Sequence, residues 1–237
     1  MSTIETLLPG RTAAVGRRSA EQLAGAAGLV FLVLVVIQNL LKAATNPSNS
    51  ASAAQIVRFA HHDAWTVDVL VVTYVIGFPC LFLFAAGLSR FCSDLAPESE
   101  IWGRLGHSSV VVIAVLFGFV NIIQIVIVAS RSELAADPAL ATTLWAFHNA
   151  VFTLNLLAVG GALLGFGRAA SIARVVPRRI GQLAVAGALL LAVAAAPAVA
   201  EVHGSNVLAI GLVGFLCWLV LLATTSVRLL RAHSLQP

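Results

Sequence analysis

Charged residues are scarce in this chain of 237 residues: Asp, Glu, Lys and Arg together make up 10% of it, whereas hydrophobic residues make up 59%. A soluble domain carries about 25% charged residues. Because so few charges cannot cover a water-exposed surface of this size, lipid must be the solvent for much of the molecule. The composition therefore excludes an ordinary soluble domain and predicts an integral membrane protein whose first partner is the lipid bilayer.

Cysteine pairs and common catalytic motifs are missing as well. The three cysteines, Cys80, Cys92 and Cys217, are odd in number and include no CxxC pair, which disfavours both a disulfide framework and a zinc knuckle. Neither the zinc-protease motif HExxH nor the nucleophile motif GxSxG occurs. The net charge of +4 does not indicate a nucleic-acid partner, because the basic residues lie in short segments between apolar runs and form no basic face with interleaved aromatics.

Six apolar runs are each long enough to cross a bilayer, which takes about 20 residues in a helix. They cover residues 22–42, 66–88, 108–130, 143–166, 181–200 and 206–228. The sequence thus predicts an all-α polytopic fold: a bundle of six transmembrane helices over residues 22–230, between an N-terminal tail of residues 1–21 and a C-terminal tail of residues 231–237. The first run is too long for the apolar core of a signal peptide, so we interpret it as a retained helix.

The basic residues between the runs predict how the bundle is oriented. If the N-terminus lies in the cytoplasm, the alternating connections place 11 of the 14 basic residues inside. The positive-inside rule therefore favours both termini in the cytoplasm. The basic residues left on the outer side are Lys42, Arg58 and Arg131. Trp65 and Trp145 are expected at the outer interface, where aromatic belts form.

The first outer connection carries a helical pattern of its own. Residues 53–64 read AAQIVRFAHHDA, which places Ile56, Phe59 and Ala60 on one side of a helix. This spacing predicts a short amphipathic helix on the outer surface, before the second span.

Polar residues within the apolar runs gather toward the outer side. Because such groups are costly in hydrocarbon, each needs a partner or a role. We predict an outward-open polar pocket that binds a ligand and whose members are Asp68, Asn121, Gln124, His148, Asn155, Glu201 and His203. The alternative is that these side chains only bond neighbouring helices, at about 0.6 kcal/mol per contact, or meet interfacial water.

Histidines near this pocket raise a metal or haem site as a second hypothesis. His61, His62 and His148 are the candidate metal ligands, and Asp68, seven residues after His61, is expected to share its face. A haem would need two facing axial ligands, such as His148 with His61, His62 or His203. Adjacent histidines on a helix point about 100° apart, however, which makes His61 and His62 poor joint ligands. The sequence therefore predicts no resident cofactor.

Several segments carry a resemblance to a known family. They are AGAAGLVFLVLVV in the first run, SAAQIVRFAHHDAW before the second, DPALATTLWAFHNAVFTLN at the fourth, RAASIARVVPRRIGQL before the fifth and GLVGFLCWLVLLATTSVRLLR in the sixth. Together they resemble a broad group of uncharacterised six-helix integral membrane proteins, common in actinobacteria and classed as a domain of unknown function. The resemblance implies the fold and a location in the bacterial plasma membrane, and it implies no activity. Residues 177–181, PRRIG, lack the tryptophan that the group's pattern has there.

Three functions follow from these observations. The first is a non-enzymatic membrane protein that binds a small or lipid-like ligand through the outer polar pocket, or assists an assembly with another membrane protein or a second copy of itself. The second is a small transporter or channel, which the near absence of polar groups in the inner halves of the runs disfavours. The third is a metal- or haem-dependent enzyme that uses His148 and its neighbours.

Overall fold

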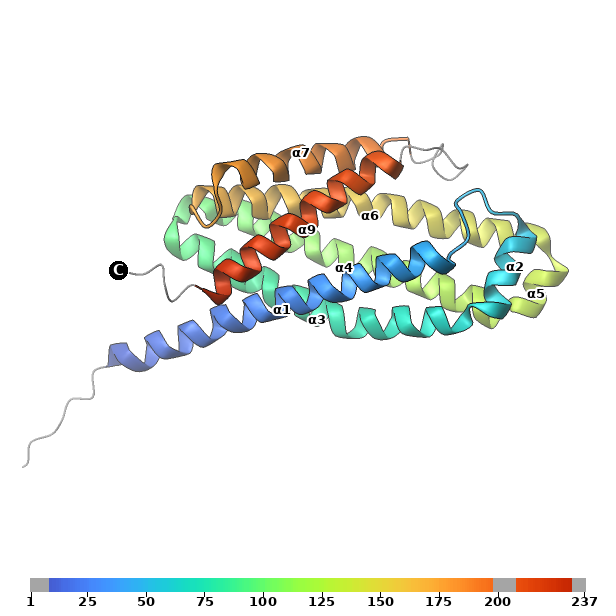
Figure 1. Ribbon diagram of the computed structural model, residues 1–237, viewed down its shortest axis with the longest axis horizontal. Coiled ribbons are helices and arrows are strands. Elements are labelled where there is room, and N and C mark those ends of the chain that lie inside the picture. The colour runs from blue at the N-terminus through green and yellow to red at the C-terminus, as the bar shows by residue number, and fades with distance from the viewer. Residues whose placement is uncertain (1–8, 198–207, 232–237) are drawn as a thin grey trace, which may run out of the picture.

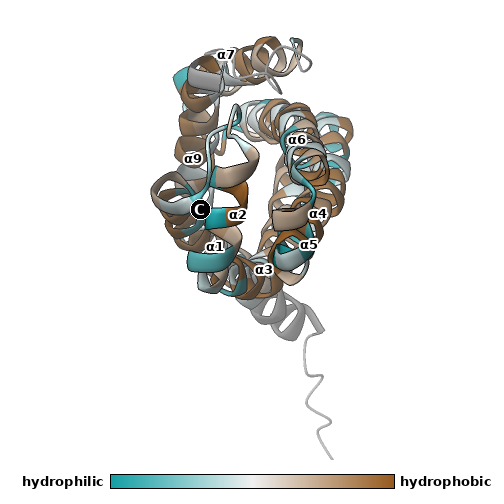
Figure 2. Cartoon of the chain, turned by 90° about the vertical axis from the view of Figure 1, so that its right-hand side faces the viewer, coloured by the Kyte–Doolittle hydropathy of each residue, from teal (hydrophilic) through white to brown (hydrophobic). Residues whose placement is uncertain are grey.

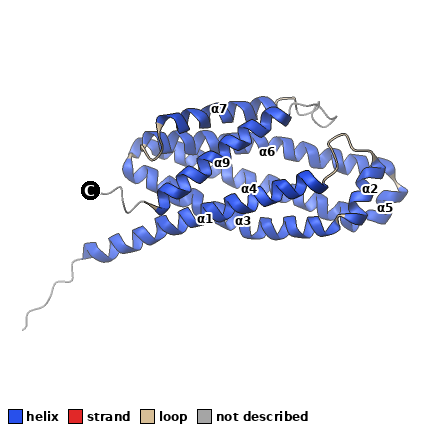
Figure 3. Ribbon diagram, viewed as in Figure 1, coloured by secondary structure: helices blue, strands red, loops and turns tan. Residues whose placement is uncertain are grey.

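The computed structural model describes residues 9–197 and 208–231, and all regular structure within these ranges is helical (Figure 3). The long helices are α1 (Pro9–Thr45), α3 (Ala64–Leu95), α4 (Glu100–Ala129), α6 (Pro138–Ile172), α7 (Arg178–Ala195) and α9 (Leu208–Leu230). The short ones are α2 (Ala53–His62), η1 (Pro97–Ser99) and α5 (Arg131–Ala136). The described chain has six helices that are long and apolar enough to cross a membrane, which confirms the predicted all-α polytopic fold class.

Several helices continue beyond the apolar runs that predicted them. α1 begins at Pro9, inside the segment of residues 1–21 that we expected to be a tail, and α6 extends to Ile172. Hydropathy detects only the part of a helix that contacts lipid, whereas backbone hydrogen bonding continues into the polar region. α6 has a clear start signal: the Asp137 side chain accepts hydrogen bonds from the N–H groups of Ala139 and Leu140, at 3.0 and 3.1 Å.

The long helices form a ring, which is seen along its axis in Figure 2. In ring order, α1 packs against α3, α3 against α4, α4 against α6, α6 against α7, α7 against α9, and α9 against α1. α1 begins and α9 ends at the same end of the bundle, whereas α2 and α5 lie at the other end (Figure 1). We call the first the arginine-rich end and the second the capped end. The helix ends and connections at the arginine-rich end carry Arg90, Arg104, Arg168, Arg174, Arg178 and Arg179.

The outward faces of the helices are apolar. Large side chains such as Leu40, Val75, Ile122, Leu157 and Leu189 are exposed along the middle of the bundle. Water would penalise so much exposed apolar surface, whereas the hydrocarbon core of a bilayer does not. The surface therefore agrees with the lengths of the helices in indicating a membrane-embedded bundle.

Glycines bring pairs of helices into close contact. Gly165 on α6 packs against the α4 backbone so closely that an added Cβ would lie 2.7 Å from the Cα of Gly106 and 2.8 Å from the carbonyl oxygen of Trp102. Near the arginine-rich end, Gly25 on α1 packs in the same way against the α9 backbone, where an added Cβ would lie 2.7 Å from the carbonyl oxygen of Ser226 and 2.9 Å from the backbone N of Leu230. Such small-residue contacts let membrane helices approach through van der Waals packing. Toward the capped end α1 and α9 diverge (Figure 1).

The short helix α2 lies across the capped end of the ring. Its N-terminus is fixed by a capping box, in which Ser52 and Gln55 each bind the other's backbone N–H. Ile56, Phe59 and Ala60 are buried, so the predicted amphipathic helix is confirmed together with its apolar face. This face packs mainly on α5 and α6, with Trp145 against Phe59, and thus covers the bundle end.

Candidate functional site

The buried amide and imidazole side chains lie between the middle of the bundle and its capped end. They come from α1, α4 and α6, and in the described part of the chain they are Gln38, Asn121, Gln124, His148, Asn149 and Asn155. The buried polar residues toward the arginine-rich end are instead hydroxyls, such as Ser99, Thr225 and Ser226. The predicted gathering of polar groups in one half of the bundle is therefore present in the structure.

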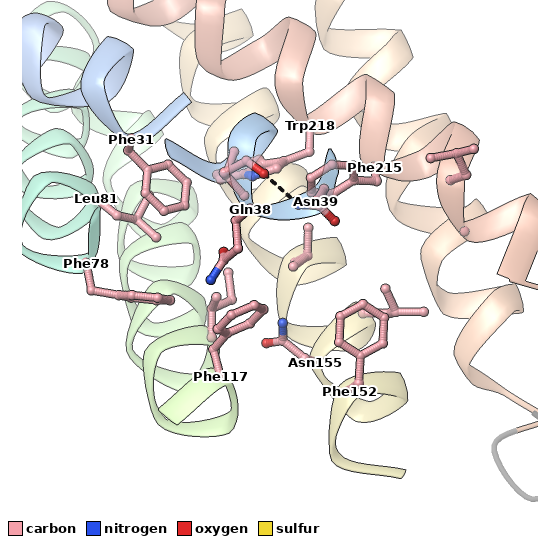
Figure 4. A pocket seen from close by; sticks show the side chains of 16 residues that line it. Phe31, Gln38, Asn39, Phe78, Leu81, Phe117, Phe152, Asn155, Phe215 and Trp218 are labelled. Carbon is pink, nitrogen blue, oxygen red and sulfur yellow. Dashed lines mark hydrogen bonds between the residues drawn. The ribbon is translucent and has the colours of Figure 1, made fainter. Parts of the chain in front are cut away.

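A cavity of about 150 Å³ lies inside the ring, next to these polar groups (Figure 4). Five helices form its wall, α1, α3, α4, α6 and α9, and most of the lining is aromatic or aliphatic. The aromatic lining residues are Phe31, Phe78, Phe117, Phe152, Phe215 and Trp218. Three amides also line it: Gln38 and Asn39 from α1 and Asn155 from α6. An apolar cavity with a few polar groups is the usual form of a small-molecule site.

Several polar atoms in and above the cavity have no hydrogen-bond partner among the described residues. In the wall these are Nε2 of Gln38 and Oδ1 of Asn155. Figure 4 shows the Gln38 amide extending into the cavity toward Phe117, and Asn155 lying between Phe117 and Phe152. A buried polar group left unpaired costs about 1–3 kcal/mol, so each of these atoms favours an occupant with complementary polar groups.

A second polar layer lies one helical turn closer to the capped end. Asn121 follows Phe117 by four residues on α4, and His148 precedes Phe152 by four residues on α6, so each lies above a cavity-lining ring. Both are buried, as is Gln124 one turn further on. Oδ1 of Asn121, both amide atoms of Gln124 and Nε2 of His148 have no partner among the described residues.

The His148 ring is held in one orientation by its neighbours. It stacks on Trp145, with ring centroids 4.5 Å apart and an angle of 6° between the planes. Asn149 donates from Nδ2 to the carbonyl of Asn49 at 3.1 Å, so its Oδ1 is the acceptor facing Nδ1 of His148, also at 3.1 Å. Nδ1 therefore carries the proton and Nε2 is the unprotonated nitrogen. The chain after α1 is anchored beside it, because Nε1 of Trp145 donates to the carbonyl of Ser48 at 2.8 Å.

Lys42, the only lysine in the chain, lies at this level of the bundle. It is the last residue of the predicted span 22–42, and it lies in the last turn of α1. Its stem is partly exposed, but its Nζ is buried over the Phe117 ring, 4.3 Å from the centroid, and lies 5.5 Å from the centroid of Phe152. Both rings line the cavity.

Of the five predicted pocket residues that the structure describes, only Asn155 contributes to the cavity wall, while Asn121, Gln124 and His148 are buried in the layer above it. Asp68 does not join them. It is exposed, because the turns of α3 direct its neighbours Val67 and Leu70 into the core, and Asp68 is rotated about 100° from Val67. Glu201 and His203 lie outside the described residues.

The candidate metal ligands are not brought together. His61 and His62 are exposed at the end of α2, whereas His148 is buried in α6. Because α2 ends at His62 and α3 begins at Ala64, His61 and Asp68 belong to different helices and do not share a face as expected. Across the described ranges no three His, Cys, Asp or Glu residues form a group that could hold a metal ion.

One predicted interface residue also has a different role. Trp65 is exposed as expected, but Trp145 is buried beneath α2, so it stabilises the capped end instead of facing lipid. The aromatic lining, Gln38, Asn39 and Lys42 are the site residues that the sequence analysis missed. A lone lysine one turn after two amides at the end of an apolar run was the signal that could have identified α1 as part of the site.

These features define the class of the molecule: a polytopic helical membrane protein with a polar and aromatic cavity between its helices. The chain matches no protein-family model, and neither the curated proteins nor the solved structures include a significant match to it. The resemblance to the actinobacterial six-helix group stays a prediction, and the functional conclusion depends on the cavity itself.

Proposed function

We propose that this protein binds a lipid-like ligand in the cavity and does so in the bacterial plasma membrane, as a non-enzymatic binding protein. The main support is the cavity of about 150 Å³, whose aromatic wall contains the unpaired amide atoms of Gln38 and Asn155. An apolar cavity of this size holds a benzene-sized group, so a longer chain would extend beyond it.

Exposed residues in the cavity wall support a ligand that arrives from the membrane. α1 and α9 diverge toward the capped end (Figure 1). Each of these helices contributes a cavity-lining residue that is not buried: Asn39 on α1 is partly exposed, and Leu212 on α9 is 59% exposed. A hydrocarbon chain would pass between these helices without crossing water, which favours an amphipathic ligand over a water-soluble one.

Passage through the bundle is less well supported than binding. Between the cavity and the arginine-rich end the ring is filled by a buried apolar layer that includes Phe84, Phe166 and Leu88. A conduction path needs polar groups or water along its length. The described core thus favours a site that is open to one side over a through-path.

Filling the cavity tests the proposal. Val35→Trp adds an indole to the wall, and we expect it to lower the affinity for labelled dodecanol in nanodiscs of zwitterionic lipid by about tenfold or more. Val33→Trp is the matched control, since Val33 is 57% exposed on the same helix. Equal binding by the two variants, with the lipid background of empty nanodiscs subtracted, would argue against the cavity as the site.

We also propose that both termini are cytoplasmic, on the basis of the arginine distribution. Ser132→Cys at the capped end should react with a membrane-impermeant maleimide in intact cells, whereas Glu98→Cys at the arginine-rich end should react only after permeabilisation. Both positions are exposed, so accessibility reports the side of the membrane. The unaltered chain gives the background from its own cysteines, and the reverse labelling pattern would overturn the orientation.

A further inference from the structure

Lys42 is the one buried cation beside the cavity for which the described structure provides no anion. Its Nζ has no hydrogen-bond acceptor among these residues, and its neighbours are the faces of Phe117 and Phe152. The ion pairs described between side chains, Arg90–Asp94 and Arg104–Glu100, lie at the opposite end of the bundle. Removing an ammonium from water is costly, and ring faces offset only part of that cost.

The unpaired donors near Lys42 point to what would complete the site. Gln38 lies one turn before Lys42 on the same face of α1, and its Nε2, also without a partner in the described structure, is directed into the cavity. Both groups lie beside Phe117, because the Lys42 ammonium stands over that ring and the Gln38 amide extends toward it (Figure 4). Their natural complement is an oxyanion, which accepts several charge-assisted hydrogen bonds.

The surroundings restrict the kind of anion. The space next to these donors is lined by Phe31, Phe78, Phe117 and Phe152, which favour a hydrocarbon chain over a hydrated ion. A free inorganic anion would lose its water here and gain few donors in return. An amphiphile gains from both parts of the site, because its chain contacts the rings while its head group meets Lys42.

We propose, building on the lipid-like ligand proposed above, that the ligand carries an anionic head group, a carboxylate or a phosphate. The head group accepts hydrogen bonds from Nζ of Lys42 and Nε2 of Gln38. The first carbons of its chain occupy the aromatic cavity, and the rest passes between α1 and α9 into the bilayer.

The test compares head groups on one chain length. Dodecanoate, dodecyl phosphate, dodecanol and dodecylamine are each titrated against the full-length protein in nanodiscs of zwitterionic lipid, with empty nanodiscs subtracted. We expect at least one of the two anions to bind about tenfold or more tightly than dodecanol, and dodecylamine to bind most weakly. Acetate and inorganic phosphate at the same concentrations should not displace the bound anion.

Variants then assign the preference to its residue. Lys42→Met should remove the difference in affinity between the anions and dodecanol, whereas Lys42→Arg should retain most of it. Arg131→Met, which removes an exposed positive charge at the same end, is the matched control and should behave as the wild type. Dodecanol binding also reports that each variant is folded.

The outcomes separate this inference from the proposed function. If wild-type protein binds dodecanol and both anions equally, or if Lys42→Met keeps the preference for an anion, the proposed anionic head group is wrong and the lipid-like ligand stands.

Displacement of the bound anion by acetate or inorganic phosphate alone would overturn the inference that the ligand is an amphiphile. If Glu201→Gln binds dodecanoate about tenfold or more tightly than the wild type and Lys42→Met removes that gain, an internal carboxylate is the partner of Lys42 and the proposal is overturned. Binding of none of the four amphiphiles would remove the proposed function as well.

Discussion

Replacing Trp145 with alanine is expected to lower the free energy of unfolding by about 3–5 kcal/mol. The side chain is only 2% exposed and lies between the Phe59 ring of α2 and the His148 ring of α6. Alanine would leave a large cavity there and remove the donor to the Ser48 carbonyl. The measurement is unfolding in mixed micelles by titration with a denaturing detergent.

Two further variants separate packing from hydrogen bonding. Trp145→Phe keeps most of the ring contact and loses the Nε1 donor, so we expect a smaller cost of about 1–2 kcal/mol. Trp65→Ala removes a tryptophan that is 54% exposed at the same end and should change stability by less than about 0.5 kcal/mol. Hydrogen exchange in residues 46–63 should be faster in Trp145→Ala, because the connection and α2 lose their anchor. A cost for Trp145→Ala no larger than that for Trp65→Ala would contradict this account of the capped end.

Adding a single methyl group at Gly165 is expected to lower stability by about 1–3 kcal/mol. The new Cβ would collide with the backbone N of Gly106, and the other close atoms also belong to the α4 backbone. Backbone atoms cannot rotate away as a flexible side chain can, so Gly165→Ala must push α4 and α6 apart. This pair of helices makes the most extensive contact in the described bundle.

The control has the opposite expected sign. Gly77 is buried in α3, but a Cβ there would find its nearest neighbour, a carbon of Phe31, at 3.5 Å, which is ordinary contact. Gly77→Ala should therefore stabilise the protein by up to about 1 kcal/mol, because alanine loses less backbone entropy than glycine in a helix. If the two glycine variants shift the unfolding midpoint in the same direction, close backbone contact is not what requires glycine at position 165.

The functional residues show where sequence reasoning reached its limit. Asn121, Gln124, His148 and Asn155 were predicted from their depth along the apolar runs, and all four are buried in the polar half of the bundle. Asp68 has a suitable depth too, yet it faces outward. Depth follows from the rise of 1.5 Å per residue, so hydropathy alone places a residue along the bundle axis.

Lys42 was missed for a related reason. A basic residue at the end of an apolar run normally extends its ammonium to the head groups, and the positive-inside rule treats it as a topological charge. Its Nζ instead lies over Phe117 and near Phe152, which belong to α4 and α6. No pattern within residues 22–42 shows that rings from two other helices will stand beside this side chain.

The sequence by itself determined that lipid surrounds the protein, how many helices are apolar enough to span it and the depth of each polar group, since these depend on hydrophobicity and helix rise. It also determined α2 and its buried face, through the helical spacing of Ile56, Phe59 and Ala60. The tertiary structure decided how each helix is rotated about its axis, because close contacts such as Gly165 against Gly106 select which faces meet. That rotation directs Asp68 outward and Gln38 into the cavity. It also places aromatic rings from other helices beside Lys42, and these rings join the separate polar residues into one candidate binding site.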